Sequence, residues 1–287
     1  MCQILGVSRS AYYDWLTRPP SKRSLENKAI LRELVKLHTK YPTFGLDPLY
    51  TLLKPLFGAS RNRIHKIKQS VGIRSLRHKA YKVTTNSNHN NTVSPNLLGR
   101  KFKAVRPNQV WVSDITYIAT GEGWLYCAIV KDLFTKKIVG FATSERINTQ
   151  LCLDALNMAI FRQKPPRGLI FHSDRGVQYT ATAFRSLLNQ KGFLQSMTRK
   201  GNPYDNAVAE NFFSCLKCEC IYLSHFKTRS SAKLAIFSYI ETFYNRVRPH
   251  SSIGWANPVE FERHFVNQSI HQPQEMKCYE AARSKAA

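Results

Sequence analysis

From residue 110 onward, the spacing of the apolar residues is first typical of strands and then alternates between the spacings typical of helices and of strands. Alternating, β-branched segments predict three successive strands at 110–118, 124–130 and 138–143, with a hairpin turn at 121–123. Helices then alternate with short apolar strands: the helices are expected at 149–162, 181–191, from 206 onward and at 231–245, the strands at 168–173 and 193–197. Three meandering strands followed by βα units predict an α/β domain, a mixed five-stranded sheet with flanking helices.

The residues before this domain predict a small, basic, all-helical module over 1–73. Helical periods occur at 25–39, 49–53 and 61–71. Ahead of them, Gly6 makes a turn and Ser8 is a suitable N-cap for a short helix that exposes Arg9. This spacing matches the second half of a DNA-binding helix-turn-helix that is truncated at its front. An ordinary capped amphipathic helix fits the same residues equally well.

Two segments of lower regularity complete the predicted organisation. Residues 74–108 are basic and then polar, without periodicity, which indicates an extended linker that follows DNA. The α/β domain is expected over 109–265, and 266–287 is expected to be a C-terminal tail.

The charge of the chain restricts its partners. There are 43 Lys and Arg residues against 18 Asp and Glu residues, a formal net charge of +25. Such a surplus implies a polyanion, and nucleic acid is favoured over a membrane surface or a purely structural ribosome-like role. The longest apolar stretch, 124–130, is too short to span a membrane, and the sequence opens without a signal peptide, so we expect a cytoplasmic protein.

The seven cysteines are odd in number and irregularly spaced, which is typical of reduced thiols rather than of a disulfide framework. Cys215, Cys218 and Cys220 are close enough in sequence to suggest zinc. They lie on an expected helix and no second cysteine pair follows, so buried thiols are the favoured interpretation and zinc is the alternative.

Three carboxylates stand out because acids are scarce. Asp114 interrupts an apolar strand, Asp174 ends another strand at a glycine-containing loop, and Glu210 lies on the helix that follows. Each has an ordinary explanation when taken alone: a salt-bridged strand residue, a turn residue or a solvated helix face. Lys217 lies on the same helical face as Glu210, and Asp205 competes as a ligand but is better placed to cap the helix.

Together the three acids point to metal chemistry. Two strand carboxylates and one helix carboxylate, in this order, can converge at one edge of a sheet. A pair of Mg²⁺ ions needs several hard oxygen ligands, more than one side chain supplies. We therefore predict Asp114, Asp174 and Glu210 as catalytic residues and metal ligands.

Four blocks of sequence carry a family resemblance. They are WVSDITY (111–117), HSDRGVQY (172–179), KGNPYDNAVAE (200–210) and YNRVRPHSSIGWANP (244–258). The chain resembles the DDE transposases of bacterial insertion sequences with two overlapping frames, specifically the second-frame product, which is related to retroviral integrases. Asp174 and Glu210 have 35 residues between them, the spacing of this group's signature.

The resemblance implies a ribonuclease H-like catalytic domain that uses Mg²⁺ or Mn²⁺, two ions per site, to cleave one strand at each element end and transfer the freed 3′-OH. Lys217 resembles a basic residue that contacts the element end. Further DNA contacts are expected at Arg9, Arg175, Arg199, Lys200, Arg246 and Arg248. For Asn245, Arg246, Arg248 and His250, a structural or DNA-positioning role is favoured over a catalytic one. The resemblance also implies a multimer on DNA and the upstream-frame product as fusion or partner.

Two other functions remain open from the sequence. A DNA-binding regulator could have kept the fold without the chemistry, although the complete triad argues against this. A ribonuclease H-type nuclease acting on RNA–DNA hybrids would not need the basic helical module. The segment 46–48 is also less basic than in relatives, which puts DNA contact at this turn in doubt.

Overall fold

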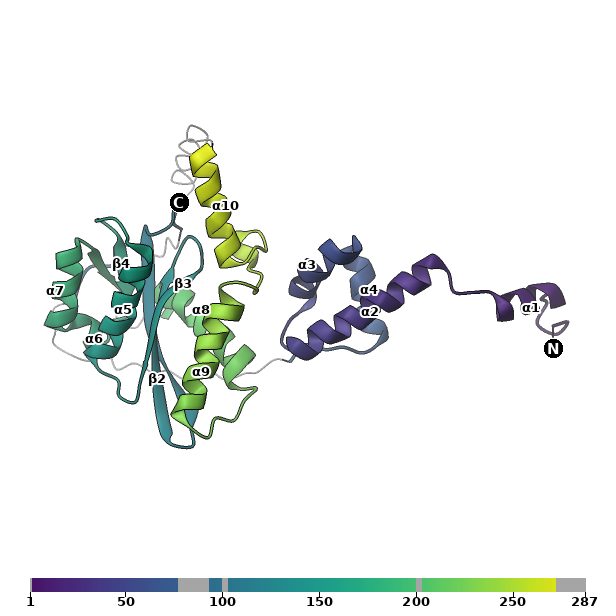
Figure 1. The fold of residues 1–287 in the computed structure, drawn as a ribbon, viewed down its shortest axis with the longest axis horizontal. Coiled ribbons are helices and arrows are strands. Elements are labelled where there is room, and N and C mark those ends of the chain that lie inside the picture. Colours follow the sequence, from purple (N-terminus) through teal and green to yellow (C-terminus); the bar gives the residue numbers. More distant parts are fainter. Residues whose placement is uncertain (1, 77–92, 100–102, 200–202, 272–287) are drawn as a thin grey trace. The chain divides into compact units, whose positions relative to one another are not determined.

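The computed structural model describes residues 2–76, 93–99, 103–199 and 203–271 (Figure 1). The chain divides into two compact units, with the boundary after Leu76. Each unit has a core of its own and is described separately.

The N-terminal unit is helical. Its elements are α1 (Arg9–Thr17), α2 (Lys22–Lys40), α3 (Leu46–Phe57) and α4 (Arg61–Ser70). Serine side chains at positions 8, 21 and 60 accept hydrogen bonds from the first turns of α1, α2 and α4, which confirms Ser8 as a cap. A small apolar core that includes Ile30, Leu34 and Ile64 joins α2, α3 and α4. Helix α1 buries no side chain, and Arg9 is exposed.

The second unit contains a five-stranded sheet in the order β3-β2-β1-β4-β5. The strands are β1 (Val110–Thr120), β2 (Gly123–Asp132), β3 (Ile138–Ser144), β4 (Ile170–Ser173) and β5 (Leu194–Met197). Strands β1, β2 and β3 pair antiparallel, whereas β4 pairs parallel with β1 and with β5. The predicted mixed five-stranded, ribonuclease H-like sheet with flanking helices, preceded by a helical module, is confirmed.

Helices cover both faces of this sheet (Figure 1). They are α5 (Thr149–Gln163), α6 (Val177–Thr180), α7 (Thr182–Lys191), α8 (Ala207–Leu216), α9 (Arg229–Ser238) and α10 (Pro258–His271), with short turns η1 (Pro203–Asn206), η2 (Lys217–Ile221), η3 (Tyr239–Tyr244) and η4 (Ser251–Ile253). Trp111 and Val130 face the core that α5 and α7 close, while Val112 and Ile129 face the core that α8 and α9 close. The alternation of the strand side chains therefore supplies both cores.

Three segments differ from the sequence predictions. Residues 93–99, expected to be linker, pack against β5: Ser94 donates to Gln195, and the Leu97 N–H donates to Ser196. The residues 77–92 of that linker lie outside the described residues. The tail expected from 266 begins inside α10, which continues to His271. The long helix expected from 206 changes to a π-helical turn at Lys217. The packing of residues 93–99 depends on tertiary contacts, which periodicity does not report.

Every helix in the described part of the chain is too short or too polar to cross a membrane.

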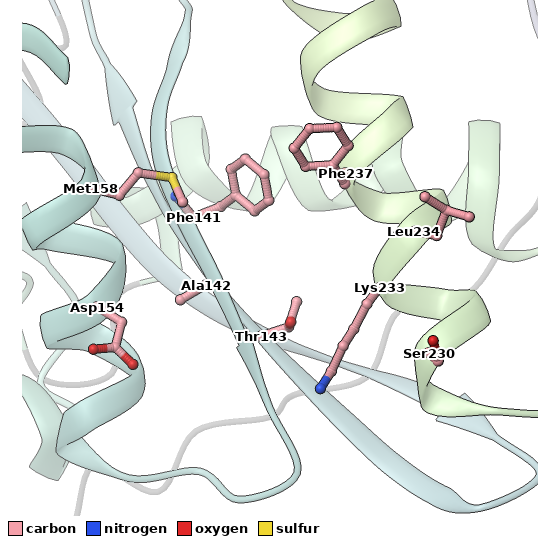
Figure 2. A pocket seen from close by; sticks show the side chains of 9 residues that line it. All are labelled: Phe141, Ala142, Thr143, Asp154, Met158, Ser230, Lys233, Leu234 and Phe237. Atoms are coloured by element: carbon pink, nitrogen blue, oxygen red, sulfur yellow. The ribbon is translucent and has the colours of Figure 1, made fainter.

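A cavity of about 500 Å³ lies beside the edge strand β3 (Figure 2). It is lined by residues of three elements: Phe141, Ala142 and Thr143 of β3, Asp154 and Met158 of α5, and Ser230, Lys233, Leu234 and Phe237 of α9. None of the predicted catalytic or DNA-contacting residues lines it. The cavity is therefore distinct from the site that the carboxylates indicate.

The close approach of α5 to β3 depends on Gly140. A Cβ at this position would overlap the carbonyl oxygen of Ala155 and lie 2.8 Å from the Cβ of Ala159. Gly140→Ala should destabilise the second unit by about 2–3 kcal/mol, because strand and helix must move apart. Urea denaturation measures this. Ala142→Val, two residues along the same strand at the cavity, is the control and should cost less than about 1 kcal/mol. Equal costs for the two variants would contradict the packing argument.

Candidate active site

Asp114 lies in the middle strand of the sheet, with β2 on one side and β4 on the other. Its Oδ1 accepts a hydrogen bond of 2.8 Å from the Ile115 N–H. Val112, two residues earlier on the same face of β1, belongs to the core that α8 covers. The Asp114 carboxylate therefore lies on the α8 side of the sheet.

Asp174 follows the last residue of β4. Val112 of β1 and His172 of β4 are registered partners in the parallel pair, so Asp114 and Asp174 both stand two residues beyond that partnership. This register brings the two carboxylates level on neighbouring strands. The Asp174 Oδ1 accepts a 3.0 Å hydrogen bond from the Gly176 N–H, and a Cβ on Gly176 would lie 3.1 Å from that oxygen. Gly176 thus allows the loop to pass close to the carboxylate.

Glu210 comes from the first turn of α8, which packs against β1. Phe212 and Leu216 bury the opposite face of the helix in the core and fix its rotation. Glu210 is partly exposed. The helix thereby turns its one acidic residue away from its apolar face.

The three carboxylates share one electrostatic environment. Burial, followed by the charge of Asp174, raises the pKa of Asp114 well above its ordinary value, and Glu210 adds to this effect. Burial and the charge of Asp174 also raise the pKa of Glu210. Within the described residues, no three His, Cys, Asp or Glu side chains are close enough to form a ready-made ion site. The raised pKa values of Asp114 and Glu210 show that these carboxylates lie near enough to Asp174 for their negative charges to interact unfavourably.

Lys217 provides positive charge on this side. It ends α8 and begins η2, and its Nζ lies 5.2 Å from the centroid of the Tyr117 ring. Burial lowers the pKa of Lys217, and the charge of Asp114 opposes this effect. Glu210 and Lys217 both act electrostatically on Asp114, which agrees with the prediction that they lie on one helix near it.

A buried set of hydrogen bonds holds the strands and the loops of the site together. The Tyr179 and Ser113 hydroxyl oxygens lie 2.9 Å apart, and Ser113 donates to the Ile129 carbonyl. The His172 ring lies 2.9 Å from the Ser196 hydroxyl through Nδ1 and 2.8 Å from the Asp205 carbonyl through Nε2. Sequence reasoning did not single out His172 as a bridge between β4, β5 and the turn before α8. Its position in an otherwise apolar strand was the available signal.

Asp205 does not cap α8 as predicted. Its carboxylate is fully buried and accepts hydrogen bonds from the Arg199 N–H, from the Arg199 guanidinium at 3.0 and 3.1 Å, and from Asn96 Nδ2. Asn206 occupies the cap position without a side-chain cap bond. The capping prediction was wrong because the turn η1 directs Asp205 inward, where it holds the segments around 96 and 199.

The predicted DNA-contacting residues have different surroundings. Arg246 is exposed, and the Arg199 side chain is about half exposed although it pairs with Asp205. Arg175 is partly exposed and donates to the Thr198 carbonyl at 2.6 Å, while Lys200 lies outside the described residues. Arg248 is drawn inward into an ion pair with Glu219, and its side chain is 20% exposed. That geometry argues against the predicted phosphate contact of Arg248, because its guanidinium is largely buried as well as paired with a carboxylate, whereas Arg199 keeps half of its side chain exposed.

The cysteines of the predicted alternative zinc motif lie on α8 and η2. Cys215 Sγ accepts a hydrogen bond from Arg248 at 3.3 Å, and Cys220 Sγ lies 3.9 Å from the Ala235 carbonyl. Their partners are thus protein groups on different elements.

Lys131 is a buried cation that sequence reasoning missed. It lies on β2 with 3% of its surface exposed, its Nζ 3.4 Å from the Val208 carbonyl of α8 and 5.8 Å from the centroid of the Tyr244 ring. The signal in the sequence was a lysine inside an apolar strand. Burial lowers the pKa of Lys131 to about 7.

The class of protein to which this fold belongs is the integrase core domain. Models of the integrase core domain match residues 104–203 and 191–258. A protein of the insertion element IS600 from Shigella sonnei is 43% identical over 92% of this chain and 98% of its own length. The transposase InsF for insertion sequence IS3A of Escherichia coli is 37% identical over 91% of this chain and 92% of its own length.

The chain belongs to this family of insertion-sequence transposases, and the predicted resemblance is confirmed. It is an enzyme of DNA transposition. Among solved structures, the catalytic core domain of HTLV-2 integrase in complex with magnesium is similar at 14% identity and a TM-score of 0.44, over 56% of this chain and 99% of that one.

The burial of Lys131 predicts a pH dependence of stability. Between pH 7 and about 10 the unfolded chain holds a proton on this lysine that the folded chain has lost, so this group makes stability rise with pH. Lys131→Met should therefore be more stable than the parent by more than about 1 kcal/mol near pH 6, and the advantage should shrink toward pH 10. Urea midpoints across this range measure the difference. An advantage that does not change with pH would contradict the assignment.

Proposed function

We propose that Asp114, Asp174 and Glu210 are the catalytic carboxylates and that they hold Mg²⁺ or Mn²⁺, two ions per active site. The observation that carries the proposal is the placement of these acids: Asp114 and Asp174 each follow a registered pair of β1 and β4 by two residues, and Glu210 lies in the first turn of α8, which packs against β1. Their charges raise one another's pKa values in keeping with this proximity. Buried like charges are costly unless a cation balances them. A transposase would use the ions to cleave one strand at each element end and join the freed 3′-OH to target DNA.

The donor chemistry fits this proposal. All three side chains offer hard carboxylate oxygens, the ligands that Mg²⁺ and Mn²⁺ prefer. Asp114 lies on β1 and Asp174 directly follows the adjacent strand β4, each two residues beyond a registered pair, so both can face one ion, and Glu210 approaches from the helix. An ion held by all three residues would offset the repulsion between their charges.

Bound ions supply activation of the attacking oxygen and stabilisation of the leaving 3′ oxygen. The protein contributes placement. The sheet fixes Asp114 and Asp174, the buried face of α8 fixes Glu210, and Gly176 leaves room for the loop beside Asp174. Lys217, on the same side, supplies a cation for a phosphate of the element end.

DNA is the proposed partner at both steps, as element end and as target, and the net charge of +25 favours phosphate binding. Contacts beyond Lys217 are proposed at Arg9, Arg175, Arg199, Lys200 and Arg246. We further propose that the chain acts as a multimer on DNA, because two ends must be brought together, and that the upstream-frame product joins it as fusion or partner.

A duplex that carries the element end, incubated with Mg²⁺, separates this proposal from its alternatives. Joined products support strand transfer. Binding without nicking supports a regulator, and loss of an RNA strand alone supports a hybrid nuclease.

Removal of one carboxylate tests the metal assignment. Asp114→Ala should lower strand joining by about three orders of magnitude or more, because the ions lose a shared ligand. DNA binding should stay within a few fold of the parent, since phosphate contacts do not involve this residue. The two quantities are measured by product formation and by equilibrium binding of labelled DNA. Asp154→Ala, an exposed acid of α5 at the separate cavity, is the control and should join normally. Normal joining by Asp114→Ala would rule out its role.

The proposed phosphate contact of Lys217 predicts a second, different phenotype. Lys217→Ala should weaken binding of the element end several-fold and reduce the salt slope of binding by about 1. Its affinity for Mn²⁺ should be unchanged. Lys233→Ala, an exposed lysine of α9, controls for the loss of charge alone. A parallel loss of Mn²⁺ affinity in Lys217→Ala would contradict the phosphate role.

A further inference from the structure

Glu219 occupies an unusual place for an acidic residue. It lies two residues after Lys217 in the π-helical turn η2 that continues α8, and its side chain is only 9% exposed. π-Helical turns inside helices are rare, and surrounding contacts must maintain them. The partners of Glu219 are therefore the groups that hold this turn.

Three hydrogen-bond donors from a distant part of the chain surround the Glu219 carboxylate. Arg248 binds it in a bidentate manner, with Nη2 at 2.7 Å from Oε1 and Nε at 2.9 Å from Oε2. The Tyr239 hydroxyl donates to Oε2 at 2.7 Å. The same Arg248 Nη2 also donates to Cys215 Sγ of α8 at 3.3 Å. The guanidinium thus contacts both the last turn of α8 and the π-helical turn after it.

The surroundings make this pair an integral part of the fold. Burial by itself lowers the pKa of Arg248, but the hydrogen bonds and charge of Glu219 outweigh it and raise the pKa above its ordinary value. Separating a buried ion pair costs free energy, because each partner would leave an uncompensated buried charge. Arg248 and Glu219 therefore remain paired.

The segment that carries Arg248 is itself attached to the sheet. Asn245 accepts a hydrogen bond from the Ile138 N–H at 2.9 Å and donates to the Ile138 carbonyl at 3.0 Å. These bonds tie the residues just before Arg248 to the start of β3. A continuous path of contacts therefore runs from the edge of the sheet through Asn245 and Arg248 to Glu219, and so to the turn that begins with Lys217.

We infer that the Arg248–Glu219 ion pair is a positioning device for the active helix: it fixes η2 against the sheet and thereby holds Lys217 beside Tyr117 and Asp114. Arg248 is a positioning residue that acts through Glu219. The inference rests on the proposed function for the role of Lys217 toward DNA, but the placement of Lys217 can be measured without DNA.

The test uses the full chain and two substitutions. Arg248→Lys keeps the buried positive charge but loses the bidentate geometry, and Arg248→Gln loses both. Arg162→Gln is the matched control, since it breaks the Arg162–Glu241 ion pair between α5 and η3, which involves neither Glu219 nor Arg248. Circular dichroism and thermal unfolding establish that each variant is folded.

The direct readout is acetylation of Lys217 by an amine-reactive reagent in the absence of DNA, followed by mass spectrometry. Release of the turn should raise the labelling rate of Lys217 several-fold in both Arg248 variants and leave it unchanged in Arg162→Gln. An unchanged rate in a folded Arg248 variant overturns the inference. Failure of both variants to fold also overturns it, since the pair would then be a determinant of folding rather than of position.

A double-mutant cycle with Lys217→Ala links position to DNA. If Arg248 acts through Lys217, Arg248→Lys weakens binding of the element end in the parent several-fold and adds little in the Lys217→Ala background. Full additivity overturns the inference. A Lys217→Ala variant that binds the end normally, with labelling of Lys217 still increased in Arg248→Lys, would instead refute the proposed phosphate contact and leave the positioning role intact.

Discussion

Asp114 and Asp174 stand level because β1 and β4 pair in parallel with Val112 opposite His172. A shift of one residue in that register would turn one carboxylate to the other face of the sheet. The pairing is secured from both sides: Trp111 and Phe171 lie in the core under α5 and α7, and Val112 lies in the core under α8. Buried hydrogen bonds also constrain the two strands: Ser113 of β1 bonds Tyr179, and His172 of β4 bonds Ser196 of β5. The rest of the site is arranged around these two strands.

The repulsion between the acids is a cost that the apolar cores must offset. Burial and the neighbouring charge make ionisation of Asp114 unfavourable, and the Ile115 N–H and Lys217 only partly compensate. Carboxylates in such surroundings are stabilised when a cation lies between them, which is the basis of the proposed metal site. Helix α8, which carries Glu210, is anchored by Phe212 and Leu216 in the core and is followed by the Glu219–Arg248 pair.

Some of the arginines form ion pairs inside the fold, and others are exposed on the surface. Arg199 and Arg248 pair with Asp205 and Glu219, so part of the cationic surplus secures loops around the site. Arg9 and Arg246 are exposed and are available to a polyanion. A basic residue near an active site therefore has to be assessed by its partners before a DNA contact is assigned to it.

The sequence by itself determined the order of strands and helices, the mixed sheet and the family, because hydrophobic periodicity and short motifs are local properties of the chain. It also singled out Asp114, Asp174 and Glu210, since acids are scarce and stand out in apolar segments. Only the tertiary structure decided that Asp205 turns inward to Arg199, that Arg248 pairs with Glu219 across 29 residues and that Lys131 is buried beneath α8. Those outcomes depend on which distant segment supplies the partner of each charge, and that choice is made by packing, which no local pattern encodes.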